Sequence, residues 1–149
     1  MERRLILRQA KTDDRDRLDV LVFALGDELE RQYRYPASHA VTRALVHHGI
    51  DTEDAVFVAE SDGEIVGMVA WVAVPGMSPE IAHGVGTYVL PDWRRQGISK
   101  ALREAARFHC IRRGRTAVYG TAAEHNTAAI ESVTRAGFVE AGRFFRLEL

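Results

Sequence analysis

Residues 89–102 read Val-Leu-Pro-Asp-Trp-Arg-Arg-Gln-Gly-Ile-Ser-Lys-Ala-Leu. A β-rich run ends at Pro91, a basic turn follows, and apolar residues at helical spacing begin at Ile98. The unpaired amides at the start of a helix, with the positive end of its dipole, attract phosphate groups. Gly97 lets the backbone approach such an anion closely, and three side chains add positive charge: Arg94, Arg95 and Lys100. The segment predicts a phosphate or pyrophosphate site where a strand meets a helix.

The same strand, turn and helix pattern also occurs as plain structure. The segment lacks the GxxxxGK[ST] string of Walker loops and the GxGxxG string of dinucleotide-binding folds. The residues alone leave two interpretations open, a phosphate site or a structural turn.

Three strands are predicted upstream of this segment. Residues 55–60 and 64–74 are rich in β-branched and apolar residues, and the Ser-Asp-Gly sequence between them predicts a hairpin. A third run, residues 81–90, ends at the proline of the turn. Its two glycines, Gly84 and Gly86, predict a bulge or a close backbone approach.

Helical and extended segments alternate around these strands. The other predicted elements are a strand at 5–8, a helix with apolar residues from Leu18 to Leu29 that ends before Pro36, a helix from Ser38 to Gly49, a helix at 98–111, a strand at 116–121, a helix at 126–136 and an extended stretch at 142–149. This order predicts an α/β fold with a mixed sheet and helices on both faces.

Composition is typical of one soluble domain spanning residues 1–149, because 46% of the residues are hydrophobic and the formal net charge is −1. The longest apolar run, residues 66–74, is shorter than the roughly 20 residues of a transmembrane helix. No secretory signal pattern follows Met1, and Cys110 is the single cysteine. We therefore expect a cytoplasmic protein without membrane association.

Charge is divided unevenly along the chain. Residues 1–92 carry nine basic and sixteen acidic side chains, whereas residues 93–149 carry eleven basic and five acidic ones. An anionic ligand would favour the second part and a cation the first. The near-neutral total argues against a general nucleic-acid binder, and the histidines show no metal-ligand spacing, so no metal is expected.

Two segments resemble the motifs of a known family. Residues 94–99, Arg-Arg-Gln-Gly-Ile-Ser, resemble the [Q/R]xxGx[G/A] motif of the GCN5-related N-acetyltransferase (GNAT) superfamily, and residues 88–91 resemble its strand-then-proline pattern. Residues 126–130 and 135–138 resemble its second landmark, Asn…Ala…Gly-Phe. The order of the predicted elements is also similar to that of the family over nearly the whole chain.

The resemblance implies a mostly antiparallel sheet of six to seven strands and an acetyl-CoA-dependent N-acyltransferase. The backbone at 88–90 would bind the pantetheine arm, and the amides at 95–100 would hold the pyrophosphate. The implied cofactor-binding residues are Tyr88, Val89, Leu90, Arg94, Arg95, Gln96, Gly97, Ile98, Ser99, Lys100 and Asn126.

Acetyl transfer to an amine needs a base, because an alkylammonium has a pKa near ~10.4. The position of the strand carboxylate in related enzymes falls at His83, and Glu80 is a second candidate that would act through water. The Leu90 amide is expected to polarise the thioester carbonyl. A structural histidine and a solvated carboxylate are the alternative interpretations of the first two residues.

The resemblance places an acceptor pocket on the first predicted helix. The candidate residues there are Asp27, Glu28 and Tyr33. They would attract a cationic amine, although helix-surface carboxylates are also common as solvated groups. Exposed strand edges are compatible with a homodimer.

The chain departs from the family pattern at two positions. Ser99 replaces the usual Gly or Ala, and Val133 stands where many members have a tyrosine that protonates the leaving thiolate. The valine keeps open an alternative function, a catalytically impaired CoA-binding regulatory module. A phosphate binder unrelated to acetyl transfer is a third interpretation.

Overall fold

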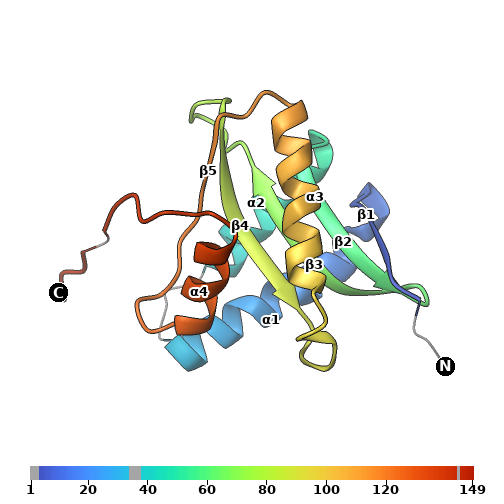
Figure 1. Cartoon of the computed structure of the whole chain (residues 1–149), viewed down its shortest axis with the longest axis horizontal. Coiled ribbons are helices and arrows are strands. Elements are labelled where there is room, and N and C mark those ends of the chain that lie inside the picture. Colours follow the sequence, from blue (N-terminus) through green and yellow to red (C-terminus); the bar gives the residue numbers. More distant parts are fainter. Residues whose placement is uncertain (1–3, 34–37, 144) are drawn as a thin grey trace.

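A central sheet of five strands runs through the molecule (Figure 1). The structure is a computed structural model that describes residues 4–33, 38–143 and 145–149. The strands lie in chain order, and each neighbouring pair is antiparallel except the last, which is parallel. They are β1 (Ile6–Gln9), β2 (Ala55–Ser61), β3 (Glu64–Val72), β4 (Ile81–Val89) and β5 (Ala117–Tyr119).

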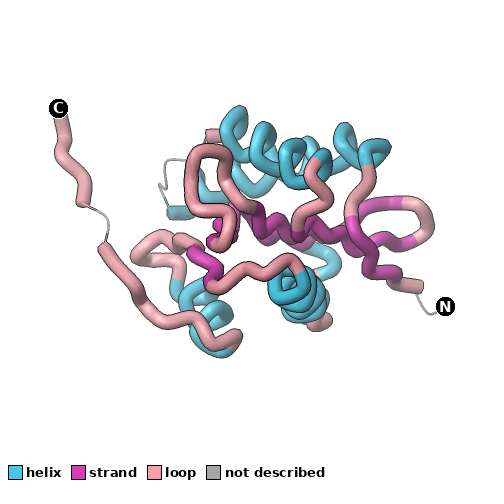
Figure 2. The backbone as a smooth tube through the Cα atoms, turned by 90° about the horizontal axis from the view of Figure 1, so that it is seen from above, coloured by secondary structure: helices cyan, strands magenta, loops and turns pink. Residues whose placement is uncertain are grey.

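Helices cover both faces of this sheet, as predicted (Figure 2). One face carries α1 (Arg15–Tyr33) and α2 (His39–Asp51). The helices on the other side are α3 (Ile98–Arg112) and α4 (Thr127–Arg135). Within the described residues, no helix is long and apolar enough to cross a membrane.

Strand β3 forms the centre of the core and is buried on both faces. Met68, Ala70 and Val72 pack into the cluster shared with α1 and α2. Val69 and Trp71 point the other way, into the cluster shared with α3. The two-sided burial explains why this strand is a nearly continuous apolar run instead of an alternating one.

Two of the predicted helix starts, at Ser38 and Asn126, are confirmed by side-chain caps. The Ser38 hydroxyl accepts a hydrogen bond from the Val41 amide at 3.3 Å, and the Asn126 side chain accepts one from the Ala129 amide at 3.1 Å. The last described residue of α1 is Tyr33, and the predicted break at Pro36 lies outside the described residues.

The hairpin between β2 and β3 and the irregularity in β4 are also confirmed. Gly84 pairs with Trp71 and Gly86 pairs with Ala70, so one residue of β4 bulges out between the two glycines. A Cβ atom on Gly86 would lie 3.0 Å from the Leu25 side chain of α1. The second glycine therefore allows the strand to pass close to the helix.

Strand β5 separates from β4 after a short contact. The two strands pair only from Ile81 to His83 on β4. From Gly84 to Val89, the outer edge of β4 has no strand partner in the part of the chain that the structure describes. Backbone N–H and C=O groups on this edge can therefore bond to other partners.

The number of strands differs from the prediction, because five are present instead of six to seven. The described residues between 142 and 149 form no strand. Phe145, Leu147 and Leu149 alternate with polar residues, yet all three are largely exposed. Alternation specifies a strand only where a neighbouring strand pairs with it and a core buries one face.

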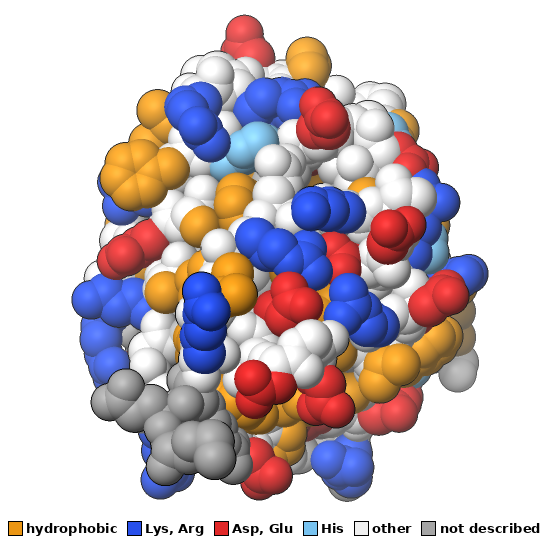
Figure 3. Space-filling model, turned by 90° about the vertical axis from the view of Figure 1, so that its right-hand side faces the viewer, with side chains coloured by type: hydrophobic (Ala, Val, Ile, Leu, Met, Phe, Trp, Pro, Cys, Tyr) orange, Lys and Arg blue, Asp and Glu red, His pale blue; other side chains and the backbone are white. Residues whose placement is uncertain are grey.

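The two oppositely charged parts of the chain form ion pairs with each other. Arg94 lies 2.8 Å from Glu28, and Arg115 lies 2.9 Å from Asp54. On the face drawn in Figure 3, basic and acidic side chains are interspersed. Part of the uneven charge is thus neutralised within the fold and does not form a one-signed surface on this face.

Candidate active site

The basic turn joins β4 to α3. A short 3-10 helix, η2 (Pro91–Trp93), leads into this turn. Two residues of the turn have left-handed backbone, Arg95 at φ 63° and Gly97 at φ 78°. Gly97 is the N-cap of α3, and its carbonyl accepts a hydrogen bond from the Ala101 amide at 3.0 Å. The amides of residues 98–100 come first in the helix, so they have no helical acceptor and lie at its positive end.

Packing against the sheet fixes the start of α3. Ile98 and Leu102 are buried, and a Cβ atom on Gly67 of β3 would lie 3.3 Å from each of them. Glycine at that position lets the helix lie close to the strand. The other side of the turn faces outward, and its exposed residues include Arg95, Gln96 and Lys100.

Arg94 connects this turn to α1. Its Nε donates to the Val89 carbonyl at 2.8 Å, and its two terminal nitrogens donate to the Glu28 carboxylate at 3.0 and 2.8 Å. The guanidinium also lies 5.3 Å from the centre of the Tyr88 ring. Hydrogen bonding to Glu28 raises the pKa of Arg94, while burial and then the Glu28 charge raise the pKa of Tyr88.

A cleft of about 250 Å³ opens between α1, the end of β4 and the start of α3. Most of the exposed lining is apolar, and the polar groups come from all three elements. The lining residues are Leu25, Glu28, Leu29, Tyr33, Thr87, Tyr88, Val89, Arg94, Ser99 and Asn126.

The cleft brings together residues that the sequence analysis assigned to two different ligands. Glu28 and Tyr33 were expected to contact an amine, whereas Ser99 and Asn126 were expected to contact the cofactor. Asn126 also caps α4, so the same side chain fixes that helix beside the cleft. An anion at the turn and a cation near α1 would therefore lie close together.

Asp27, the third residue expected to bind the amine, does not line the cleft. Its side chain is 67% exposed and lies 3.0 Å from Nε2 of His39 on α2. Asp27 and Glu28 are adjacent on a helix, and adjacent helical residues point in different directions. The geometry supports Glu28 and not Asp27 as the carboxylate of this site.

The two candidate bases lie at the far end of β4 and outside the cleft lining. His83 is four residues before Thr87, which corresponds to about 13 Å along a strand. Its ring stacks on Tyr119 with 6.2 Å between centroids, and its Nδ1 is buried without a partner among the described residues. Glu80 is exposed, and its carbonyl accepts a hydrogen bond from the Thr116 amide at 2.7 Å.

The expected role of the Leu90 amide does not fit the geometry. This amide donates to the Val66 carbonyl of β3 at 2.9 Å, so it points into the sheet. The Val89 carbonyl points the opposite way, since it accepts from Arg94. Because the N–H and C=O of one strand residue lie on the same side, the Val89 amide faces the open edge of β4.

Because Val133 cannot donate a proton, the hydroxyl groups of Ser132 and Tyr119 are candidate substitutes for the acid, and both side chains have other contacts. The Ser132 hydroxyl accepts a hydrogen bond from Arg103 at 2.6 Å, and Tyr119 is half-exposed beside His83. Three lining residues were not predicted: Leu25, Leu29 and Thr87. The two leucines are four residues apart in the apolar stripe of α1, a spacing that also fits ordinary core packing.

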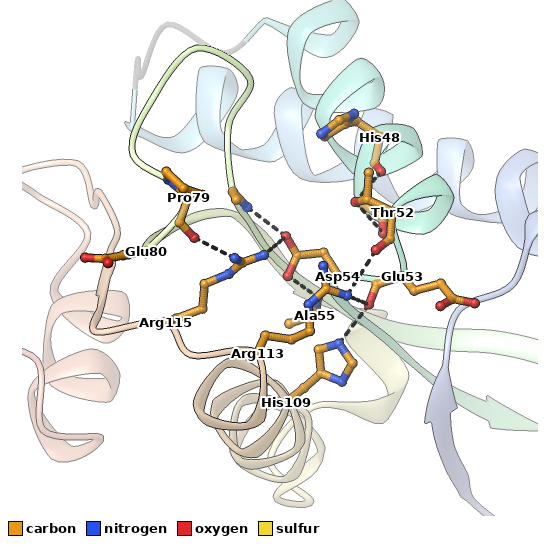
Figure 4. Close-up of polar contacts among 12 residues, drawn as sticks. His48, Thr52, Glu53, Asp54, Ala55, Pro79, Glu80, His109, Arg113 and Arg115 are labelled. Atoms are coloured by element: carbon orange, nitrogen blue, oxygen red, sulfur yellow. Dashed lines mark hydrogen bonds and ion pairs between the residues drawn. The ribbon is translucent and has the colours of Figure 1, made fainter.

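A buried ion pair fixes the chain that leads into β4 (Figure 4). Asp54 accepts hydrogen bonds from the amides of Ala55 at 3.0 Å and Ala73 at 2.8 Å, and from Arg115 at 2.9 Å. Arg115 also donates to the Pro79 carbonyl. The Asp54–Arg115 pair therefore links the start of β2 and the end of β3 to the segment that leads into β4.

No cluster of three or more potential metal ligands occurs among the described residues. Cys110 is buried in α3, and burial raises the pKa of its thiol to about 11. The thiol is therefore protonated near neutral pH and is not a reactive nucleophile.

Known proteins with a similar sequence or structure have the same fold as this chain. A model of the acetyltransferase (GNAT) family matches residues 22–138. The structure of AAC(6')-Iy, solved with a CoA-containing bisubstrate analogue, is 22% identical and covers 98% of this chain and 99% of its own, with a TM-score of 0.68. The diaminobutyrate acetyltransferase of Paenibacillus lautus, solved with its substrate and coenzyme A, is 21% identical and has a TM-score of 0.68. The match covers 91% of this chain and 75% of that chain.

An uncharacterized N-acetyltransferase of Methanocaldococcus jannaschii is 37% identical over 92 residues. The match covers 59% of this chain and 40% of that protein, so the chain spans less than half the length of this relative. The two solved structures are too distant in sequence to show more than a shared fold.

Proposed function

Because the chain belongs to the acetyltransferase (GNAT) family, we propose that it transfers the acetyl group of acetyl-CoA to a primary amine. The observation that carries the proposal is the cleft in which a helix N-terminus, Ser99 and Asn126 lie beside Glu28 and Tyr33. An anion-binding end and a carboxylate end in one cleft suit a cofactor with phosphates and an acceptor with a cationic group.

Two features of the fold fit acetyl-CoA. The open edge of β4 offers backbone groups to the amide-containing pantetheine arm, and the amides of residues 98–100 suit the pyrophosphate. Bound there, acetyl-CoA would supply an activated thioester. The relatives with aminoglycoside and diaminobutyrate substrates support an amine as the acceptor class.

The reaction is direct attack in a ternary complex. The neutral amine nitrogen forms a bond to the thioester carbon, the C–S bond breaks, and the proton of the amine passes to a base. In this proposal the Val89 amide stabilises the negative charge that develops on the carbonyl oxygen. Many members of the family have a tyrosine at position 133 that protonates the leaving thiolate, and this chain has Val133 there. Since a thiol has an ordinary pKa of about 8.5, the thiolate of coenzyme A can leave without that acid.

His83 and Glu80 remain the proposed bases, and each would act through a chain of bound waters because neither lines the cleft. Substituting either with Ala should lower turnover and leave the affinity for the cofactor nearly unchanged. Unchanged turnover in both variants would contradict the assignment of the base.

The proposal includes a cytoplasmic location, and a homodimer is compatible with it because β1 and β5 end the described sheet with unpaired outer edges. Sedimentation of the purified protein measures its oligomeric state directly.

Thermal unfolding with acetyl-CoA, coenzyme A and ATP in parallel tests the cofactor, because a ligand that binds only the folded state raises stability by RT ln(1 + [L]/Kd). Saturable shifts with both CoA species but not ATP are expected. Absence of either shift would contradict the proposal.

A panel of amines, with release of free thiol as the readout, then tests the activity. Val133 favours one second candidate, a CoA-binding regulatory module. Binding of acetyl-CoA without an acetylated product across the panel would favour that module instead of the enzyme.

A further inference from the structure

The Glu28–Arg94 ion pair crosses the cleft between the two proposed ligand ends. Glu28 comes from α1 and Arg94 from the turn before α3, 66 residues later in the chain. Both carboxylate oxygens are used by the two terminal nitrogens of the guanidinium. Such a fork-to-fork arrangement is the strongest geometry for this kind of pair.

Within the described lining of the cleft, Glu28 is the acidic side chain and Arg94 is the basic one. Their side chains are 19% and 38% exposed, so both remain reachable from the cleft. A cationic amine that enters has Glu28 as its charged partner, but Arg94 already neutralises that carboxylate. Likewise, an anion at the turn meets an arginine that is already paired.

The Arg94 guanidinium uses different nitrogens for its two partners. Its Nε is fixed on the Val89 carbonyl, and only the two terminal nitrogens contact Glu28. The turn residue Gly97, which opens α3, follows Arg94 by three positions. A pyrophosphate at this helix end would therefore lie within the range in which charges attract the guanidinium.

We propose that the Glu28–Arg94 pair couples the binding of the two substrates. The pyrophosphate of acetyl-CoA draws the terminal nitrogens of Arg94 away from Glu28 and leaves the carboxylate free for the cationic acceptor. The inference rests on the proposed function, since it takes acetyl-CoA and an amine as the ligands. By linkage, an amine bound to Glu28 strengthens the binding of the cofactor by the same factor.

Calorimetric titration with coenzyme A alone tests the coupling, because it needs no knowledge of the acceptor. If Glu28 competes with the cofactor for Arg94, Glu28→Gln should bind coenzyme A more tightly, by about fivefold. Arg94→Gln should bind it more weakly. In the Arg94→Gln background, the gain from Glu28→Gln should disappear, because the competition no longer exists.

Glu30→Gln is the matched control, since it removes one negative charge from an exposed position of the same helix. It should leave the affinity for coenzyme A within about twofold. Glu28→Ala serves as a second variant if the Gln variant does not fold, because alanine suits a helix interior and also removes the carboxylate.

Three outcomes would overturn the inference while the wild type binds coenzyme A. They are an unchanged affinity in both Glu28 variants, a gain that persists without Arg94, and an equal gain in Glu30→Gln. Failure of the wild type to bind coenzyme A would overturn the proposed function itself, so the two failures are distinguishable.

Discussion

Gly97 shows how one residue shapes the candidate cofactor site. Its φ of 78° lies in the left-handed region, and a Cβ atom there would meet no other atom within 4 Å. Space is therefore not what demands glycine within the protein. The open space lies beside the first amides of α3, where an anion would approach.

Gly97→Ala should lose about 1 kcal/mol of stability from left-handed strain and at least tenfold in affinity for coenzyme A, because the methyl group covers the amides. Gly114→Ala is the matched control, since that residue follows the other end of α3 with φ 76° and equally open surroundings. It should lose similar stability and no affinity. Urea unfolding and calorimetry measure both effects, and equal affinities in the two variants would contradict the placement of the pyrophosphate.

Asp14 gives a second prediction at the scale of single residues. It is 1% exposed and accepts hydrogen bonds from Arg8 at 2.7 and 2.9 Å, from Arg17 at 2.6 Å and from the Lys11 amide at 2.7 Å. Bonding to Arg8 is the main cause that lowers its pKa from 3.8 to about 2. A lowered folded-state pKa stabilises the fold above about pH 4, and this contribution is lost as the pH falls towards 2.

Asp14→Asn should therefore lower the free energy of unfolding by about 2 kcal/mol at pH 7, and the difference from wild type should shrink towards pH 2. Asp13→Asn, at the exposed neighbouring position, should have little effect. Urea unfolding at pH 7, 4 and 2.5 checks this. A difference that is the same at all three values would rule out a role for the carboxylate charge.

At the scale of elements, features that depend on nearby residues, such as helix caps, could be predicted from the sequence. The caps at Ser38 and Asn126 are hydrogen bonds to amides three residues later in the chain, so they depend on neighbours in the sequence. These predictions are confirmed for that physical reason.

Predictions that depend on pairing between distant segments were less accurate. The direction of the Leu90 amide is set by its bond to Val66, and the absence of a strand at 142–149 reflects the lack of a partner within the described residues. The pair of Arg115 with Asp54 joins residues 61 positions apart, and no short-range pattern reports such a contact.

Arg115→Met should be strongly destabilising, because Asp54 would remain buried without its counter-charge. Asp54 and Arg115 have side chains that are only 2% and 10% exposed. Removing one partner of a buried pair costs about 3–5 kcal/mol. Arg113→Met, two residues earlier, removes exposed bonds to the Thr52 and Glu53 carbonyls and should cost less than about 1 kcal/mol. Urea unfolding compares the two, and similar losses would contradict the special role of the buried pair.

At the scale of the whole molecule, the charge of residues 93–149 serves two purposes. Arg94 and Arg115 form pairs with residues 28 and 54, so they hold the fold together. Lys100 is exposed on the first turn of α3 and has no ion pair among the described residues, so its charge is available to a ligand.

Salt dependence separates a local charge from a general field. Lys100→Gln should weaken the binding of coenzyme A by about three- to tenfold at 50 mM salt and by less at 500 mM, because salt screens an exposed charge. Arg112→Gln is the control, because Arg112 lies at the other end of α3, about 18 Å from Lys100. This distance exceeds the screening length of about 10 Å at 0.1 M salt. The affinity of the Arg112→Gln variant for coenzyme A should match that of the wild type within about twofold at 0.1 M salt and above. Calorimetric titrations at several salt concentrations measure both variants. Equal losses would mean that the net charge of the whole surface attracts the cofactor, whereas a loss confined to Lys100→Gln places the anion at the start of α3.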